Sequence, residues 1–104
     1  MQVQVHADSS VKANSYLTQT VEEAVGNAVR LWTPRITRVE VHLSDINGQK
    51  GGADDKRCLL EARIGGLQPI AVTHQAPTLH DAVEGAADKL KKVLKNTLDR
   101  LSDR

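Results

Sequence analysis

Alternation of apolar and polar residues predicts four β-strands, each with one buried face. The expected strands are residues 1–6, 35–43 and 56–64, and a segment that begins at Ile70 and ends before Pro77 and Thr78. The side chains expected to face the core from the second and third strands are Thr37, Val39, Val41, Leu43, Cys58, Leu60 and Ala62. Gly65-Gly66 should form the hairpin turn between the last two strands. Residues 44–55 are polar and rich in glycine, and we expect a loop there.

Two further segments carry apolar residues at helical spacing. The first helix should begin at a cap on Asn14 or Ser15 and run to about Leu31, because Pro34 disfavours its continuation. Its apolar face consists of Leu17, Val21, Val25, Ala28 and Trp32. The second helix follows a near capping box, Thr78 with Asp81 three residues later. Its apolar stripe is Leu79, Val83, Ala86, Leu90, Leu94, Thr97 and Leu101, widened by Val93 and Leu98.

The predicted order is β-α-β-β-β-α, which indicates an α+β fold. One face of a four-stranded sheet would be covered by two helices, giving a two-layer sandwich. We expect a single domain over residues 1–104, since this length supports one core. The other sheet face is too polar for a second layer, because it carries Gln4, His6, Arg38, Glu40, His42, Arg57, Glu61 and Arg63.

Composition restricts the possible functions. The formal net charge is +1, so nucleic-acid binding would depend on how the charges are distributed. There is no Phe, and the aromatic residues are Trp32 and Tyr16. A sheet that stacks bases on several rings is therefore excluded, and any RNA contact should use phosphates, 2′-hydroxyls and shape. No apolar run is long enough to span a bilayer, no signal-peptide pattern is present, and the single cysteine agrees with a cytoplasmic location.

The second helix carries a concentration of cations. Lys89, Lys92 and Arg100 lie on one flank of its apolar stripe, and Lys91 and Lys95 lie on the other. A helix that buries one face and presents cations from the rest is suited to a polyanion. The alternative is a solvated helix face, since Lys near a helix C-terminus also complements the helix dipole.

The histidines raise the possibility of a metal site or an enzyme. His6 and His42 share the exposed sheet face and would be close if their strands are adjacent, yet two imidazoles do not make a zinc site without further ligands. Cys58 faces the other way. His74 and His80 flank the helix cap, where no nucleophile motif accompanies them, and surface or cap roles are expected. The sequence therefore predicts no catalytic residue, no metal and no cofactor.

The chain resembles the ribosome hibernation-promoting factors, also called ribosome-associated inhibitors. The resemblance covers nearly the whole chain and is sharpest at Thr78-Leu79, Ala82-Val83, Gly85 and Asp88-Lys89-Leu90, with further similarity in residues 71–74 and 50–58. It implies a stationary-phase or stress protein that binds the small ribosomal subunit and its 16S-type rRNA in the groove used by mRNA and tRNA. It also implies a short form, monomeric off the ribosome, with neither a membrane nor a small-molecule partner.

The family's RNA-contacting cations are carried over to Lys89 and Lys92, with Lys95 and Arg100 nearby and Lys91 as an extra charge. Asn96 occupies a position that is commonly basic in the family. The first helix departs from the family, because its exposed positions include Glu22 and Glu23 where members carry more Lys and Arg.

Two interpretations of the remaining surface stay open. The sheet-face cations are Arg38, Arg57 and Arg63, which either contact RNA or form cross-strand ion pairs with neighbouring glutamates, the second being favoured. The alternative function is a protein–protein interaction module of the same fold that has lost ribosome binding. An open edge strand and a polar sheet face would serve such a module.

Overall fold

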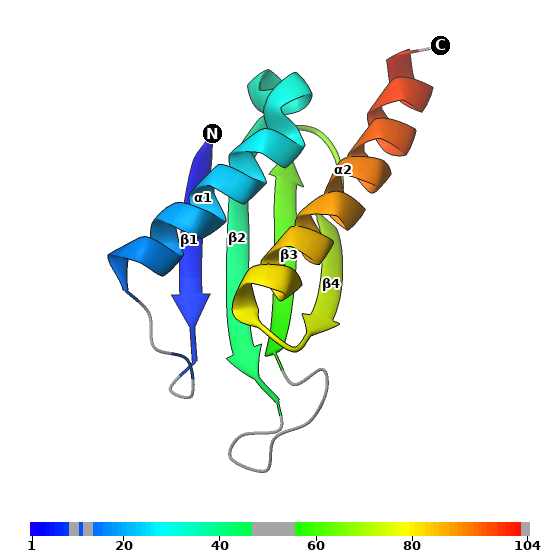
Figure 1. The fold of residues 1–104 in the computed structure, drawn as a ribbon. Coiled ribbons are helices and arrows are strands. Elements are labelled where there is room, and N and C mark those ends of the chain that lie inside the picture. Colours follow the sequence, from blue (N-terminus) through cyan, green and yellow to red (C-terminus); the bar gives the residue numbers. More distant parts are fainter. Residues whose placement is uncertain (9–10, 12–13, 47–55, 103–104) are drawn as a thin grey trace.

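A computed structural model describes residues 1–8, 11, 14–46 and 56–102 of the chain. Its elements, in order, are β1 (Gln2–Ala7), α1 (Ser15–Val29), the 3₁₀ helix η1 (Arg30–Arg35), β2 (Ile36–Asp45), β3 (Lys56–Ile64), β4 (Ile70–Ala76) and α2 (Leu79–Ser102). The predicted β-α-β-β-β-α order and α+β class are confirmed (Figure 1). The glycine-rich part of the expected loop, at 48–52, lies outside the described residues. No helix in the described part of the chain is long and apolar enough to cross a membrane.

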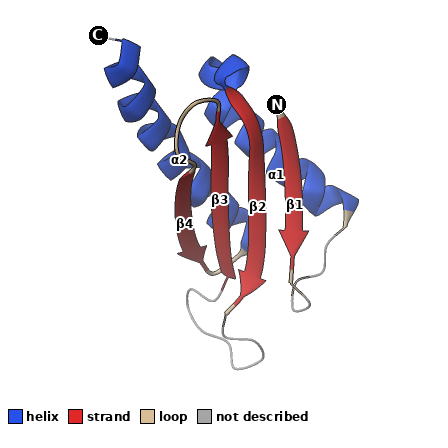
Figure 2. Cartoon of the chain, turned by 180° about the vertical axis from the view of Figure 1, so that it is seen from behind, coloured by secondary structure: helices blue, strands red, loops and turns tan. Residues whose placement is uncertain are grey.

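The four strands form one mixed sheet in the order β1-β2-β3-β4. β1 and β2 pair in parallel because α1 crosses over between them, whereas β2, β3 and β4 are antiparallel neighbours. Both helices lie on the same face of the sheet (Figure 1), and the view from behind shows that no helix covers the other face (Figure 2). The predicted two-layer arrangement is therefore confirmed, and β1 and β4 are the edge strands.

The core lies between the sheet and the two helices. Val39, Val41 and Leu43 of β2 are buried there, as predicted. The buried set from the other elements includes Cys58, Leu60, Ala62, Val21, Val25, Ala28, Val83, Ala86, Leu90, Leu94 and Leu98. The helix pattern was wrong at one position, since Val93 is 36% exposed at the margin of the stripe. The apolar face of α2 is thus narrower on that side than its sequence indicates.

Thr37 was expected to face the core, and this prediction is wrong. Ile36 pairs with Ile64 and Arg38 pairs with Arg63, so β2 has one residue more than β3 between these pairs. This β-bulge turns Ile36 inward and leaves Thr37 exposed, with its Oγ1 donating to the Arg63 carbonyl at 3.1 Å. Strict alternation cannot anticipate such an inserted residue.

Two element boundaries also differ from expectation. The first α-helix ends at Val29 and continues as the 3₁₀ helix η1, which contains Pro34. Proline lacks the N–H of the α-helical ladder and disfavours the α conformation in the residue before it, so the tighter turn begins early. Leu31, the expected end of the helix, therefore lies in η1 and is 73% exposed. At the other end of β2, Ser44 and Asp45 belong to the strand instead of the following loop.

Cys58 provides a direct test of the core. Its side chain is fully buried, and burial raises the pKa of the thiol to about 12. At neutral pH the folded protein should therefore hold far less thiolate than an unfolded chain, and the thiolate is the form that reacts with thiol reagents. We expect a thiol reagent to label Cys58 only in denaturant. Rapid labelling of the native protein would contradict the packing described above.

Candidate nucleic-acid interface

The five cations predicted on α2 are all exposed. We refer to Lys89, Lys92 and Arg100 as the β4-side row and to Lys91 and Lys95 as the α1-side row. The first assignment is supported by Lys89, whose Nζ donates to the carbonyl oxygen of Thr73 in β4 at 2.8 Å. The second is supported by Lys91, which lines a groove between α1 and α2. The structure therefore places Lys89 and Lys91 on the flanks expected for them, and the rows of Lys92, Lys95 and Arg100 follow from helical spacing.

Lys89 differs from the other cations of α2 because it already has a partner in the fold. The Thr73 carbonyl belongs to the edge strand β4, and a lysine at a sheet edge discourages pairing with another chain. Lys89 can therefore act structurally even without RNA. Among the described residues, none forms an ion pair with the four remaining cations, Lys91, Lys92, Lys95 and Arg100.

The groove between the helices, of about 360 Å³, is lined by more carboxylates than lysines. Glu23 of α1 and Glu84 and Asp88 of α2 line it, together with Lys91 and His80. Three carboxylates against one lysine give this interhelical groove the wrong charge for phosphate. Lys91 of the α1-side row consequently lies in an acidic surface.

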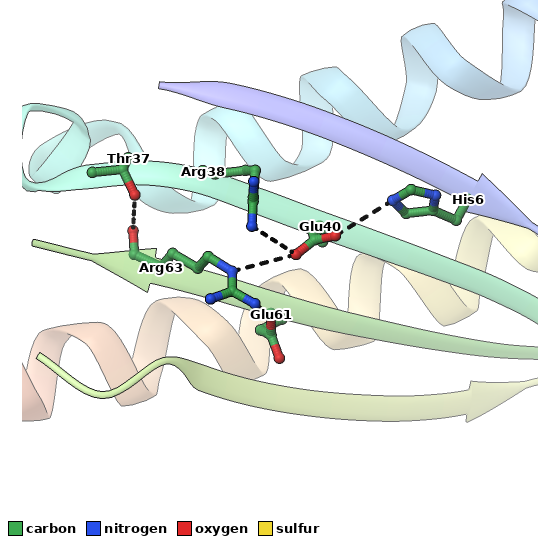
Figure 3. A network of polar contacts seen from close by, with 6 residues as sticks. All are labelled: His6, Thr37, Arg38, Glu40, Glu61 and Arg63. Atoms are coloured by element: carbon green, nitrogen blue, oxygen red, sulfur yellow. Dashed lines mark hydrogen bonds and ion pairs between the residues drawn. The ribbon is translucent and has the colours of Figure 1, made fainter.

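On the open sheet face, the predicted ion pairs are present for two of the three arginines. Glu40 Oε2 lies 3.3 Å from Arg38 Nη2 and 3.4 Å from Arg63 Nε, and Arg63 Nη2 lies 2.9 Å from Glu61 Oε1 (Figure 3). Glu40 and Glu61 are directly opposite each other on β2 and β3, so Arg63 bridges two carboxylates that would otherwise repel. Arg57, the third arginine, forms no ion pair with any described residue.

Glu40, one of the glutamates expected to pair with the sheet-face arginines, is the centre of this network. Partial burial acts to raise the pKa of its carboxyl, but the hydrogen bond from Arg63 and the charges of Arg38, Arg63 and His6 outweigh it, so the pKa lies below its usual value. Glu40 therefore stays ionised, and its negative charge offsets the nearby arginines. The sheet face is for this reason a weaker candidate for phosphate contact than α2.

His6 and His42 are neighbours because their strands, β1 and β2, are adjacent in the sheet. They are paired residues on β1 and β2, and their rings stack with centroids 4.8 Å apart at an interplanar angle of 16°. Glu40 lies on the same face, with Oε1 3.5 Å from His6 Nε2. The sequence analysis predicted that all three residues share this face, but it did not predict that the Glu40 carboxylate lies next to the imidazole of His6.

His74 was expected to be a surface or cap histidine, and the structure corrects this. It lies on the helix-facing side of β4, half-buried, with its ring against Gly85 of α2. A Cβ on Gly85 would overlap that ring. The contact explains why this helix position carries glycine.

A mixed four-stranded sheet with two helices on one face, the second of which carries exposed cations, places the protein in the α+β class. Comparison with known families makes this specific: residues 3–102 match the family described as sigma 54 modulation protein / S30EA ribosomal protein, and the chain belongs to that family. The resemblance to ribosome hibernation factors is thereby confirmed.

Solved structures share the fold. A ribosomal subunit interface protein from Coxiella burnetii matches with a TM-score of 0.80 and 13% identity, covering 95% of this chain and 99% of its own. The N-terminal domain of Protein Y from Thermus thermophilus matches with a TM-score of 0.76 and 16% identity, covering 93% of this chain and 99% of its own. A search of curated protein sequences found no significant match.

Proposed function

We propose that this protein is a non-enzymatic translation regulator that binds the small ribosomal subunit and occupies its mRNA and tRNA channel under stress or in stationary phase. It would act in the cytoplasm as a single domain, without cofactor or small-molecule substrate. Family membership and the named structural neighbour, a ribosomal subunit interface protein, support ribosome association. The mechanism is occupancy: a rigid domain fills a channel that mRNA and tRNA need.

The observation that carries the proposal is the set of exposed cations on α2. Lys92 and Arg100 are exposed on α2 without an ion pair among the described residues, so both can neutralise phosphates without first breaking an ion pair of this kind. Lys89 adds a third charge to the same row, and its two spare N–H donors can reach solvent while one binds Thr73. The last turns of α2 extend past the sheet, where they are accessible to a large partner (Figures 1 and 2).

The acidic groove restricts how RNA can lie on the protein. Glu23, Glu84 and Asp88 would repel phosphates from the space between α1 and α2. Glu22, exposed on α1, adds to the negative charge of that side. We therefore expect the β4-side row, rather than the α1-side row or the first helix, to face ribosomal RNA.

Binding to the small subunit should weaken steeply with salt. If the three cations of the β4-side row each neutralise one phosphate, counterion release predicts a slope of about −2 to −3 in a plot of log affinity against log salt. A fourfold increase in salt would then lower affinity about thirtyfold. Co-sedimentation with purified small subunits over a salt series measures the slope. A slope near zero would contradict contact through phosphates.

The second candidate function is the protein-interaction module, and the interhelical groove favours it. Its three carboxylates would suit a basic segment of another protein better than RNA. Failure to bind small subunits at low salt would favour this alternative.

A further inference from the structure

We propose that His6, His42 and Glu40 form a zinc-binding site on the open face of the sheet. This site does not depend on ribosome binding, because it lies on the side of the sheet away from the helices (Figure 2). It also revises the expectation that no metal site is present. That expectation rested on two imidazoles without a further ligand, and the structure supplies the carboxylate.

The strand register brings the three residues together. His6 pairs directly with His42 across the parallel strands β1 and β2, and Glu40 is two residues before His42, on the same face. One ligand atom from each of the three residues lies within 4.8 Å of the other two. All three side chains thus project from neighbouring strands of a regular sheet, whose backbone is held by ladder hydrogen bonds.

The distances are close to those of a coordinated ion. Two ligand atoms bound about 2.0–2.1 Å from a tetrahedral zinc ion lie about 3.3 Å apart. His6 Nε2 and Glu40 Oε1 are already 3.5 Å apart. His42 is exposed and stacks on His6, so a rotation of its ring, without movement of the backbone, can bring its nitrogen to the same point.

The two oxygens of Glu40 are divided between different partners. Oε1 faces His6, whereas Oε2 faces Arg38 and Arg63 (Figure 3). The arginines therefore fix the orientation of the carboxylate while leaving one oxygen for an ion, as outer partners do around metal ligands. Their positive charges also oppose a cation, which limits affinity. Zinc binding would leave the ion pairs of Arg38 and Arg63 intact, because the arginines contact Oε2 of Glu40 and the ion would bind Oε1.

The ligand types select the kind of ion. Two imidazoles and one carboxylate suit zinc and related transition metals, whereas calcium and magnesium require mainly oxygen ligands. Three protein ligands would leave one position of a tetrahedral ion for water. We therefore expect one zinc ion per chain and no binding of magnesium at the same site.

Calorimetric titration of the untagged, metal-free protein with zinc chloride tests the proposal. The wild type should bind one zinc ion, and His6→Ala and His42→Ala should each lower the affinity at least tenfold. His80→Ala is the matched control, because His80 is also exposed and lies 3.5 Å from Asp81 and 3.8 Å from Glu84, but has no second histidine beside it. This variant should bind zinc as the wild type does.

A second measurement guards against misfolded variants. Cobalt added in place of zinc should give the visible absorption bands of a tetrahedral site in the wild type and in His80→Ala, and not in His42→Ala. Thermal unfolding without metal should show that all variants are folded. Absence of zinc binding by the wild type, or equal binding by wild type and folded His42→Ala, would overturn the proposal.

Discussion

Lys92→Glu combined with Arg100→Glu should reduce affinity for the small ribosomal subunit on the order of a hundredfold at moderate salt, since two attractive contacts with phosphate become repulsive. Both side chains are exposed and lie outside the ion pairs of the described residues, so the fold should survive. Lys89 is left unchanged because its Nζ also binds the Thr73 carbonyl, and its loss would mix structural and binding effects. Co-sedimentation with subunits measures binding, and thermal unfolding measures stability.

The matched control is Lys91→Glu combined with Lys95→Glu on the same helix. It makes the same change in net charge. Of the four residues only Arg100 lies in the last turn of α2, where reversing a charge costs about 0.3–1 kcal/mol through the helix dipole, so thermal unfolding of both variants corrects for this difference. It places the new charges beside the acidic interhelical groove, which we expect to face away from RNA. Binding should fall much less than in the first variant. Equal losses in the two variants would show that overall charge, rather than the β4-side row, determines binding.

Gly85→Ala should lower the free energy of unfolding by up to about 2 kcal/mol, although alanine is normally the better helix residue. The new Cβ would overlap the His74 ring, including the atom where the ring joins its own Cβ, so turning the ring does not relieve the clash. Overpacking of this kind typically costs about 1–3 kcal/mol, against about 1 kcal/mol gained from helix propensity. Denaturant unfolding of wild type and variant measures the difference.

Two further variants distinguish this clash from a general effect of alanine. Gly26→Ala on α1 adds a Cβ with nothing within 4 Å, and should stabilise the protein by about 0.5–1 kcal/mol. In His74→Ala the ring is absent, so adding Gly85→Ala to that background should no longer destabilise. A Gly85→Ala loss of the same size with and without His74 would show that the two residues are not coupled.

Regular periodicity carried most of the fold prediction. The third strand was predicted with its observed bounds, Lys56–Ile64, because alternation continues without interruption up to the Gly65-Gly66 turn. Gly66, in the five-residue connection from β3 to β4, has a φ of 79°, which glycine adopts freely. The cap of the second helix was also read correctly, since Thr78 Oγ1 accepts a hydrogen bond from the Asp81 N–H at 3.1 Å.

The errors arose where contacts between elements override local pattern. The bulge at Thr37 depends on the register between β2 and β3, and no residue within β2 signals it. The His74–Gly85 contact joins a strand to a helix, so neither residue alone reveals it. The position of Glu40 between two arginines and His6 requires the order of the strands in the sheet. Candidate cations on α2 were found from the sequence because they lie on a single element.

Competition on the small subunit tests the central claim most directly. Purified protein is sedimented with small ribosomal subunits at low salt, with and without excess mRNA and tRNA, and the bound fraction is measured. Occupancy of the mRNA and tRNA channel predicts that the protein binds and that these competitors displace it. Binding that is unchanged by saturating mRNA and tRNA would contradict the proposed position on the subunit, and absence of binding would contradict ribosome association itself.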